Sequence, residues 1–417
     1  MISLLRAYPA FRRLWLAGAT SLIGDWLSFV AVAALALSGG GGPLGLALVF
    51  AAQALPSAIV SPLAGAIVDR FDRRRVLVVV DLAAAALTTA MALACLVGWF
   101  AIVPILLMLR SAVTSAVPPG ESAALRHVVP AAELIRANTI LAGTWSVAYV
   151  AGMALGGAAA LLGPTLAIAL DAGSFLLAAS IHATLPPMPV AASERLHLLA
   201  VVRRVPADTR VALRHAAARR DTLLRAVLAK APVGLAAGAG WIALNLIGAA
   251  DRPFGPAALS FGILQALRGA GTGLGPALAS RLIAGGIPER RLVQIAYGTA
   301  FAMIAVLGLV HSPLALAVVA LVWGMGSGAN WVLAHSALQR YSNDAVIGRL
   351  AAFDELLVTA AMVASAFVGA EVAIVASTSA VALVGAGLGL AGFVAVTLAT
   401  RSSARAGDDE VRHVTDP

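Results

Sequence analysis

The chain has 417 residues, of which 60% are hydrophobic and only 12% are charged, and its net charge is +9. Soluble domains carry about 25% charged residues, so this composition excludes an ordinary soluble protein. The positive charge does not indicate nucleic-acid binding, because the arginines fall between apolar runs instead of along one polar face. Cys95 is the only cysteine, so the chain can form no internal disulfide.

Apolar runs long enough to cross a membrane recur along the whole chain. A helix of about 18 or more apolar residues is long enough to cross the hydrocarbon core of a bilayer. The short segments of alternating polarity that are typical of membrane barrels do not occur. The sequence therefore predicts an all-α polytopic membrane protein of the following twelve transmembrane helices, in two six-helix bundles: 14–37, 44–68, 76–98, 101–119, 138–161, 165–185, 222–249, 257–283, 292–310, 313–337, 350–371 and 374–399.

The connections between these runs alternate between basic and nearly uncharged. The basic ones are 69–75, 126–136, 195–220, 281–291, 340–349 and the tail from 401. Arg252 is the only basic residue in the other set. Because Lys and Arg collect in cytoplasmic loops, we expect a multi-pass protein of the cell membrane with both termini in the cytoplasm.

The longest polar stretch divides the chain near its middle. We expect an N-terminal bundle, a cytoplasmic basic linker, a C-terminal bundle and a cytoplasmic tail, at 1–187, 188–220, 221–400 and 401–417. The linker mixes apolar residues with arginines, which fits either a helix on the anionic inner leaflet or a flexible tether. The halves resemble each other weakly at a shift of about 215 residues, which places Trp26 opposite Trp241. Such a repeat is typical of transporters with a midplane site between the halves.

The loop between the second and third spans carries a dense charge pattern. Gly65, Asp69, Arg70, Arg73 and Arg74 form the pattern Gly-x-x-x-Asp-Arg-x-x-Arg-Arg. This pattern resembles the signature loop of the major facilitator superfamily. A topological role for the arginines would explain their number, but it would not explain the positions of the glycine and the aspartate.

The resemblance implies a cytoplasmic latch between the two bundles. Gly65 would let two helices approach closely. Asp69 would meet the positive N-terminal end of the eleventh span, near Gly348 and Arg349, when the cytoplasmic side is closed. Asp72 departs from the superfamily, because most members have Gly there, and we therefore do not assume a tight turn at this position.

Other segments resemble one exporter branch of this superfamily, which includes enterobactin exporters and macrolide efflux pumps. The matching stretches are "FRRLWLAGATSLIGDW" at Phe11, "ELIRANTI" at Glu133, "ALDAGSFLLA" at Ala169 and "DAVIGRLAAFDELL" at Asp344. "GMALGG" at Gly152 resembles the antiporter motif of the fifth span, with Met153 in place of a proline. Its small residues still allow close helix packing.

Several ionisable residues lie inside predicted spans, where a charge is costly and is by default a functional candidate. Asp25, Asp171 and Arg110 are the candidates for proton coupling. Burial favours the neutral form of an acid and a nearby arginine favours the charged form, so a proton can bind and leave. Alternatively, Asp25 is a structural partner of Arg110 or Arg268. Asp81 and Asp354 lie nearer the span ends, and the favoured interpretation is that they are interfacial or capping charges.

Polar and aromatic residues within the spans are candidates for a substrate cavity. They are Trp26, Gln53, Asn245, Gln265, Arg268, Asn330 and Trp331. Each polar one could equally form a structural interhelical hydrogen bond, worth about 0.6 kcal/mol on average. The sequence does not decide between these two roles.

The functional prediction is a secondary active transporter that exports an amphipathic small molecule of drug or siderophore type, by proton antiport through alternating access. The alternative is a facilitator or importer of the same fold for another small solute, because fold does not decide direction. Lys230 is the only lysine and follows Ala229, so the chain contains no ATP-binding Gly-Lys-Ser/Thr loop. We therefore predict no enzyme activity, catalytic residue, metal or cofactor. The expected partners are the substrate, protons and the lipid bilayer, with the protein as a monomer.

Overall fold

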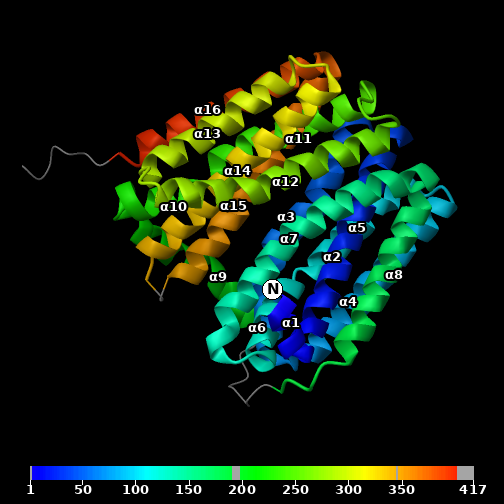
Figure 1. Ribbon diagram of the computed structural model, residues 1–417, viewed down its shortest axis with the longest axis vertical. Coiled ribbons are helices and arrows are strands. Elements are labelled where there is room, and N and C mark those ends of the chain that lie inside the picture. Colours follow the sequence, from blue (N-terminus) through cyan, green and yellow to red (C-terminus); the bar gives the residue numbers. More distant parts are fainter. Residues whose placement is uncertain (1, 190–197, 344–345, 402–417) are drawn as a thin grey trace, which may run out of the picture.

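The computed structural model describes residues 2–189, 198–343 and 346–401, and within these ranges it contains helices and no strand. The helices of the first half are α1 (Ile2–Ala7), α2 (Pro9–Ala36), α3 (Gly42–Arg70), α4 (Arg73–Leu96), α5 (Val103–Thr114), α6 (Val117–Val128), α7 (Leu134–Ala159) and α8 (Pro164–Ala183). After α9 (Leu198–Ala217), the second half contains α10 (Arg225–Leu228), α11 (Ala231–Ala250), α12 (Ala257–Ala284), α13 (Glu289–Leu307), α14 (Pro313–Tyr341), α15 (Ile347–Val375) and α16 (Thr378–Ala399). In Figure 1 these halves form two groups of nearly parallel helices.

Ten helical segments of the described chain are long and apolar enough to cross a membrane. The first, Pro9–Arg70, is in fact two helices, because the backbone leaves the helical region at Gly39 and Gly40. Gly40 has a φ of 88°, which favours glycine. The helix α12 is also long enough, although Arg268 and its glycines lower its hydropathy. Each of the twelve predicted spans falls on one of these helices, so the predicted fold class is confirmed.

Two segments bear on expectations from the sequence: the fourth span differs from its predicted bounds, and the central linker matches one of its two alternatives. The fourth span does not end near residue 119, because α5 stops at Thr114 and α6 carries the chain on to Val128. Two prolines open α6, where the missing amide hydrogens are not needed. Of the two alternatives for the central linker, the structure has a helix over Leu198–Ala217, which contacts α3 and α15.

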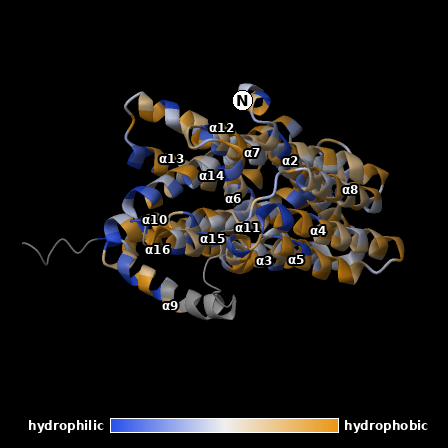
Figure 2. Ribbon diagram, turned by 90° about the horizontal axis from the view of Figure 1, so that it is seen from below, coloured by the Kyte–Doolittle hydropathy of each residue, from blue (hydrophilic) through white to orange (hydrophobic). Residues whose placement is uncertain are grey.

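The outer surface of the bundle is apolar, as contact with lipid requires. Large side chains such as Val79, Leu96 and Ile59 are more than half exposed. Figure 2 shows hydrophobic colouring along the lengths of the helices, whereas hydrophilic residues gather around α9 and α10. The end of the molecule that carries the 69–75 loop is called the basic end below, and the end that carries the 37–41 turn is called the opposite end.

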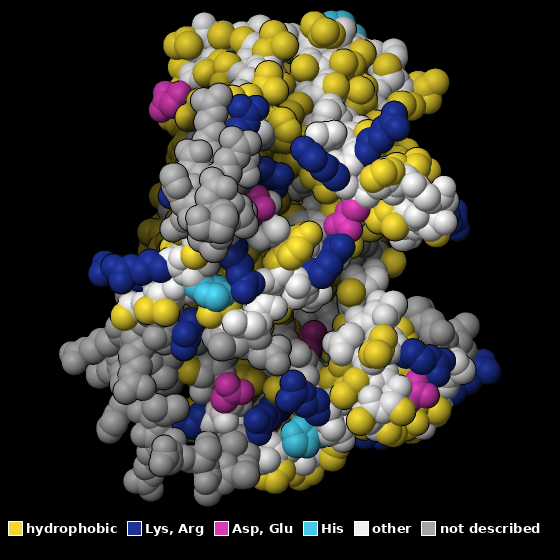
Figure 3. All heavy atoms as spheres, turned by 90° about the vertical axis from the view of Figure 1, so that its left-hand side faces the viewer, with side chains coloured by type: hydrophobic (Ala, Val, Ile, Leu, Met, Phe, Trp, Pro, Cys, Tyr) yellow, Lys and Arg dark blue, Asp and Glu magenta, His cyan; other side chains and the backbone are white. Residues whose placement is uncertain are grey.

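The two halves pack tightly toward the opposite end. The ring of Trp241 on α11 lies 4.8 Å from that of Phe50 on α3 and 5.9 Å from that of Phe29 on α2. A Cβ atom on Gly157 of α7 would lie 2.9 Å from the carbonyl oxygen of Ala258 on α12. Figure 3 shows the face that carries arginines around the basic end. In contrast to the opposite end, this face is hollowed between the halves. This conformation is therefore closed at the opposite end and open toward the basic end.

Candidate functional site

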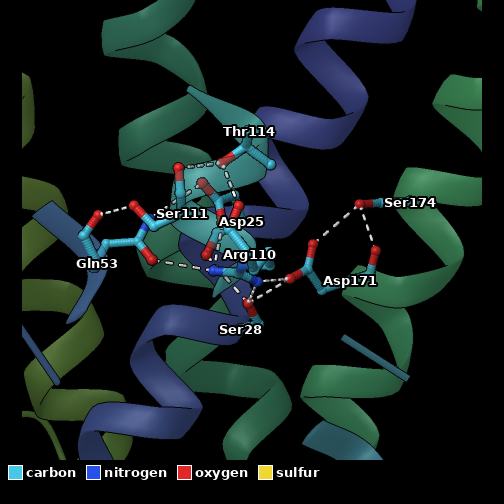
Figure 4. A network of polar contacts seen from close by, with 8 residues as sticks. All are labelled: Asp25, Ser28, Gln53, Arg110, Ser111, Thr114, Asp171 and Ser174. Carbon is cyan, nitrogen blue, oxygen red and sulfur yellow. Dashed lines mark hydrogen bonds and ion pairs between the residues drawn. The ribbon is translucent and has the colours of Figure 1, made fainter. Parts of the chain in front are cut away.

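A buried ion cluster lies in the first half, around Arg110 of α5 (Figure 4). Nη2 of Arg110 lies 2.5 Å from Oδ1 of Asp25 on α2, and Nη1 lies 2.6 Å from Oδ2 of Asp171 on α8. The side chains of Arg110 and Asp171 are fully buried, whereas that of Asp25 is 17% exposed. Three helices that are distant in sequence thus bring one cation and two acids together. These residues are called the Arg110 cluster below.

Two serine side chains bind to the Asp171 end of the cluster. Ser28, one turn after Asp25, accepts a hydrogen bond from Arg110 Nη1 at 3.0 Å and donates one to Asp171 Oδ2 at 2.5 Å. Ser174 donates to the other carboxylate oxygen of Asp171 at 3.2 Å. Asp171 is therefore held by two hydroxyl groups as well as by the guanidinium.

Gln53 of α3 connects the guanidinium with Asp25. Its Oε1 accepts a hydrogen bond from Arg110 Nη2 at 3.1 Å, and its Nε2 donates to Asp25 Oδ2 at 3.2 Å. Ser111 donates to the backbone carbonyl of Gln53 at 2.5 Å. The sequence analysis treated Gln53 as a cavity candidate, and the structure places it beside the charged residues as their bridge.

The charges of the Arg110 cluster do not balance when both acids are ionised. One guanidinium faces two carboxylates, which gives a net charge of −1 inside the membrane-spanning region. Uncompensated charge is costly there, and one proton bound to either acid removes it. Asp25 is the acid with a partly exposed side chain, so it is the one that solvent can reach.

The structure separates the two partners that the sequence allowed for Asp25. Asp25 pairs with Arg110 of its own half. In the described part of the chain, Arg268 pairs with no acid, and its contacts are with Gln265, Tyr149 and Trp323. The two membrane-embedded arginines therefore lie in different surroundings.

Arg268 on α12 lies at the boundary between the halves. Its Nε donates to Oε1 of Gln265 at 2.9 Å, and its Nη2 donates to the hydroxyl of Tyr149 on α7. The guanidinium carbon lies 5.5 Å from the ring centre of Tyr149 and 5.3 Å from that of Trp323 on α14. Gln265 also donates to Asn245 Oδ1 at 2.7 Å. Of the predicted cavity residues, Arg268, Gln265 and Asn245 thus form one hydrogen-bonded chain.

The remaining cavity candidates lie in two other places. Trp26 joins an aromatic cluster, with its ring 4.7 Å from that of Tyr149 and 6.0 Å from that of Trp145. Asn330 is buried on α14, and the adjacent Trp331 is partly exposed. The ammonium of Lys230 lies 4.5 Å from the ring centre of Trp331. Their role as a substrate surface stays a prediction.

Two buried polar pairs were missed by the sequence analysis. Nζ of Lys230 lies 2.6 Å from Oδ2 of Asp354, and Nδ1 of His182 lies 2.7 Å from Oδ2 of Asp81, with all four residues buried. The interpretation of Asp81 and Asp354 as interfacial or capping charges is therefore wrong. Each acid has a partner that is distant in sequence, and no local sequence pattern identifies such a partner.

The contacts that the structure describes do not test the predicted latch. Asp69 is exposed, and a Cβ atom on Gly65 would meet no described atom within 4 Å. Because the latch is expected only when the basic end is closed, the roles of Gly65, Asp69, Arg70, Arg73 and Arg74 stay predictions. Asp72 has a role that was not foreseen.

Asp72 is the N-cap of α4. Its side chain accepts hydrogen bonds from the backbone amides of Arg75 at 3.0 Å and Met188 at 2.7 Å. A carboxylate at this position satisfies the free amides of the first helical turn. It also ties the loop to the segment that follows α8.

The small residues of "GMALGG" pack as expected from their size. A Cβ atom on Gly152 would lie 2.7 Å from the carbonyl oxygen of Ile23, and one on Gly156 would lie 2.6 Å from that of Leu27. Both glycines therefore allow α7 to lie directly against α2, so the predicted close packing is confirmed.

In the described ranges, no group of three His, Cys, Asp or Glu residues is arranged to hold a metal ion.

The arrangement of the helices matches solved structures of membrane transporters. The fold matches the crystal structure of the nucleoside transporter NupG with a TM-score of 0.73, 11% identity, and coverage of 94% of this chain and 100% of that one. It also matches a bacterial homologue of the human lysosomal transporter Spinster, in an inward-facing and unoccupied conformation, with a TM-score of 0.67, 13% identity, and coverage of 95% and 98%. The chain therefore shares the fold of these membrane transporters.

The family follows from sequence. Residues 4–415 match the major facilitator family described as transmembrane secretion effector, and the chain belongs to it. An uncharacterized transporter of this type from Mycobacterium tuberculosis, Rv0037c, is 32% identical over 152 residues, which cover 35% of this chain and 34% of that protein. YfiS of Bacillus subtilis, also an uncharacterized transporter of this type, is 30% identical over 168 residues, 40% of each chain. The chain thus aligns with less than half the length of these relatives.

Proposed function

We propose that this protein is a secondary active exporter that exchanges protons for an amphipathic small molecule of drug or siderophore type. The proposal extends to the branch of enterobactin exporters and macrolide efflux pumps, on the strength of the sequence stretches quoted above. The observation that carries it is the Arg110 cluster, in which two acids share one guanidinium within the membrane-spanning region. A cluster that is one proton short of neutrality can bind and release a proton as access changes.

Asp25 is the proposed proton carrier. Protonation of Asp25 would weaken its contact with Arg110 and leave Arg110 and Asp171 as a neutral pair. The loaded and unloaded states then differ in charge, so the proton can bias the equilibrium between the two access states. Asp171, which is fully buried and bonded to Ser28 and Ser174, would act as the permanent counterion.

The test is the substitution Asp25→Asn, which keeps the side-chain volume and removes the titration. We expect it to abolish uphill transport driven by a pH gradient in proteoliposomes, measured with a panel of lipophilic compounds. Abundance and folding should stay normal, because Arg110 keeps Asp171 as its partner. Asp251→Asn, in an exposed turn beyond α11, is the matched control and should change nothing.

Two other results would contradict this role for Asp25. Normal abundance with normal gradient-driven transport would remove Asp25 from the mechanism and transfer the proposed role to Asp171. Poor membrane insertion of Asp25→Asn would show that Asp25 is a structural partner of Arg110. Measurement of abundance beside pH-driven transport separates these outcomes.

Direction and orientation are part of the same proposal. With the basic end in the cytoplasm, the conformation described above would be open to the cytoplasm, and a substrate for export could enter it. Deletion of an exporter raises substrate retention in cells, whereas deletion of an importer or facilitator lowers it. Impermeant labelling of a cysteine placed in the 69–75 loop, in a chain lacking Cys95, reports the sidedness. Labelling from outside intact cells would reverse the proposed orientation.

A further inference from the structure

Arg268 is a membrane-embedded cation that lacks an acidic partner in the described part of the chain. Arg110, in contrast, contacts two carboxylates and is fully buried. Arg268 is only partly buried, and its guanidinium lies near the rings of both Tyr149 and Trp323. Aromatic faces attract a cation without neutralising it. The charge of Arg268 therefore remains available to an anion that enters from the space between the halves.

Several hydrogen-bond donors on Arg268 and on residues of its neighbourhood have no acceptor among the described residues. A guanidinium has five N–H groups, of which the contacts with Gln265 and Tyr149 use two. Nδ2 of Asn245, Nε1 of Trp323 and Nε1 of Trp26 are buried donors with no partner among the described residues. A buried donor without an acceptor costs free energy. A ligand group that accepts several hydrogen bonds would satisfy this surplus.

From the charge and the donor surplus together, we propose that Arg268 anchors a binding site for an oxyanion group of the transported molecule, of which a carboxylate is the simplest example. The inference rests on the proposed function, because it names the substrate class of that transporter. A carboxylate has two oxygens and can accept a bidentate pair of N–H bonds from a guanidinium. A cationic or purely apolar substrate would leave both the charge and the donors uncompensated.

The walls of the site indicate the rest of the molecule. Tyr149 stacks on Trp145 with ring centres 5.4 Å apart, and Trp26 meets Tyr149 edge-on at 4.7 Å. These rings belong to the first half, whereas Arg268 and Trp323 belong to the second half. The expected substrate is therefore an aromatic or apolar body with one acidic group. Binding across the boundary makes its affinity depend on how the halves are arranged.

The experiment compares matched probes that differ only in the polar group. Purified full-length protein is titrated with 2-naphthoate and biphenyl-4-carboxylate, and with the amide and the primary amine built on each ring system, and binding is measured calorimetrically. We expect the wild type to bind at least one carboxylate about tenfold or more tightly than its amide and amine, the ratio expected for one charge-assisted hydrogen bond. Arg268→Gln should remove that preference, and Arg268→Lys should keep part of it. Arg281→Gln, at the exposed end of the same helix, is the control and should bind like the wild type.

The proposal is overturned if no carboxylate is preferred, including the case in which no probe binds. It is also overturned if the preference survives Arg268→Gln. If that variant does not fold, Arg268→Lys decides: a preference that is reduced but not abolished, with retained thermal stability, supports the proposal, and an unchanged preference overturns it. Asp25→Asn should retain the carboxylate preference, because equilibrium binding needs no proton cycle. In the wild type, a carboxylate preference without pH-driven transport would reject proton coupling and keep the anion site. In the wild type, pH-driven transport without a carboxylate preference would reject the anion site and keep proton coupling.

Discussion

The two halves of the molecule each place an arginine within the membrane-spanning region, and they treat its charge differently. In the first half, Arg110 is enclosed by Asp25 and Asp171 at 2.5 and 2.6 Å. In the second half, Arg268 contacts an amide, a hydroxyl and two aromatic rings. One site is rich in acceptors and one proton short of neutrality, whereas the other is rich in donors. The difference supports the two proposals made above, a proton site in the first half and an anion site in the second.

The largest expected effect comes from removing both acids of the Arg110 cluster. Asp25→Asn/Asp171→Asn leaves Arg110 as a buried cation that cannot lose its proton, at a cost of about 3–5 kcal/mol. Each single substitution leaves one acid on Arg110, so the two effects should be far from additive. Thermal unfolding in detergent and membrane abundance measure this. A double variant as stable as either single variant would contradict the charge balance described here.

A smaller effect is expected when each arginine is replaced by glutamine. Arg110→Gln removes the counterion of two carboxylates, although either acid can reduce the cost by binding a proton. Arg268→Gln removes no ion pair of the described chain, and we expect a loss of about 1 kcal/mol, the value of ordinary hydrogen bonds. The difference between the unfolding free energies of the two variants measures the contrast directly. Equal losses would mean that Arg268 has an acidic counterion in the folded protein.

The smallest effect concerns the hydroxyl that holds Asp171. Ser174→Ala removes the 3.2 Å bond to Asp171 Oδ1 and should cost about 0.5–1.5 kcal/mol. Because Asp25 does not contact Ser174, pH-driven transport should persist. Ser180, on the exposed side of the same helix, supplies the control Ser180→Ala, which should leave stability unchanged. A loss of coupling in Ser174→Ala would make Asp171, and not Asp25, the proton carrier.

The sequence predicted the helices well and the contacts between them only in part. Apolar length and the basic loops were enough to locate every span, and the cost of buried charge singled out Asp25, Arg110 and Asp171, which the structure brings into contact. The partners of Lys230 and Asp81 were not predictable, because contacts between residues distant in sequence leave no local pattern. The break between α5 and α6 was also missed, since prolines at the start of α6 do not interrupt an apolar run. Asp72 could have been recognised as a cap, because an acid directly before a helix is a typical N-cap.

The buried pair of Lys230 and Asp354 has a practical consequence. Lys230 is the only lysine of the chain, and its ammonium is buried 2.6 Å from a carboxylate oxygen. Apart from the terminal amine, an acylating reagent therefore has one primary amine to modify. It can reach that nitrogen only when the pair separates. The rate of acylation, followed by mass spectrometry, would therefore report how often Lys230 and Asp354 separate, without any introduced probe.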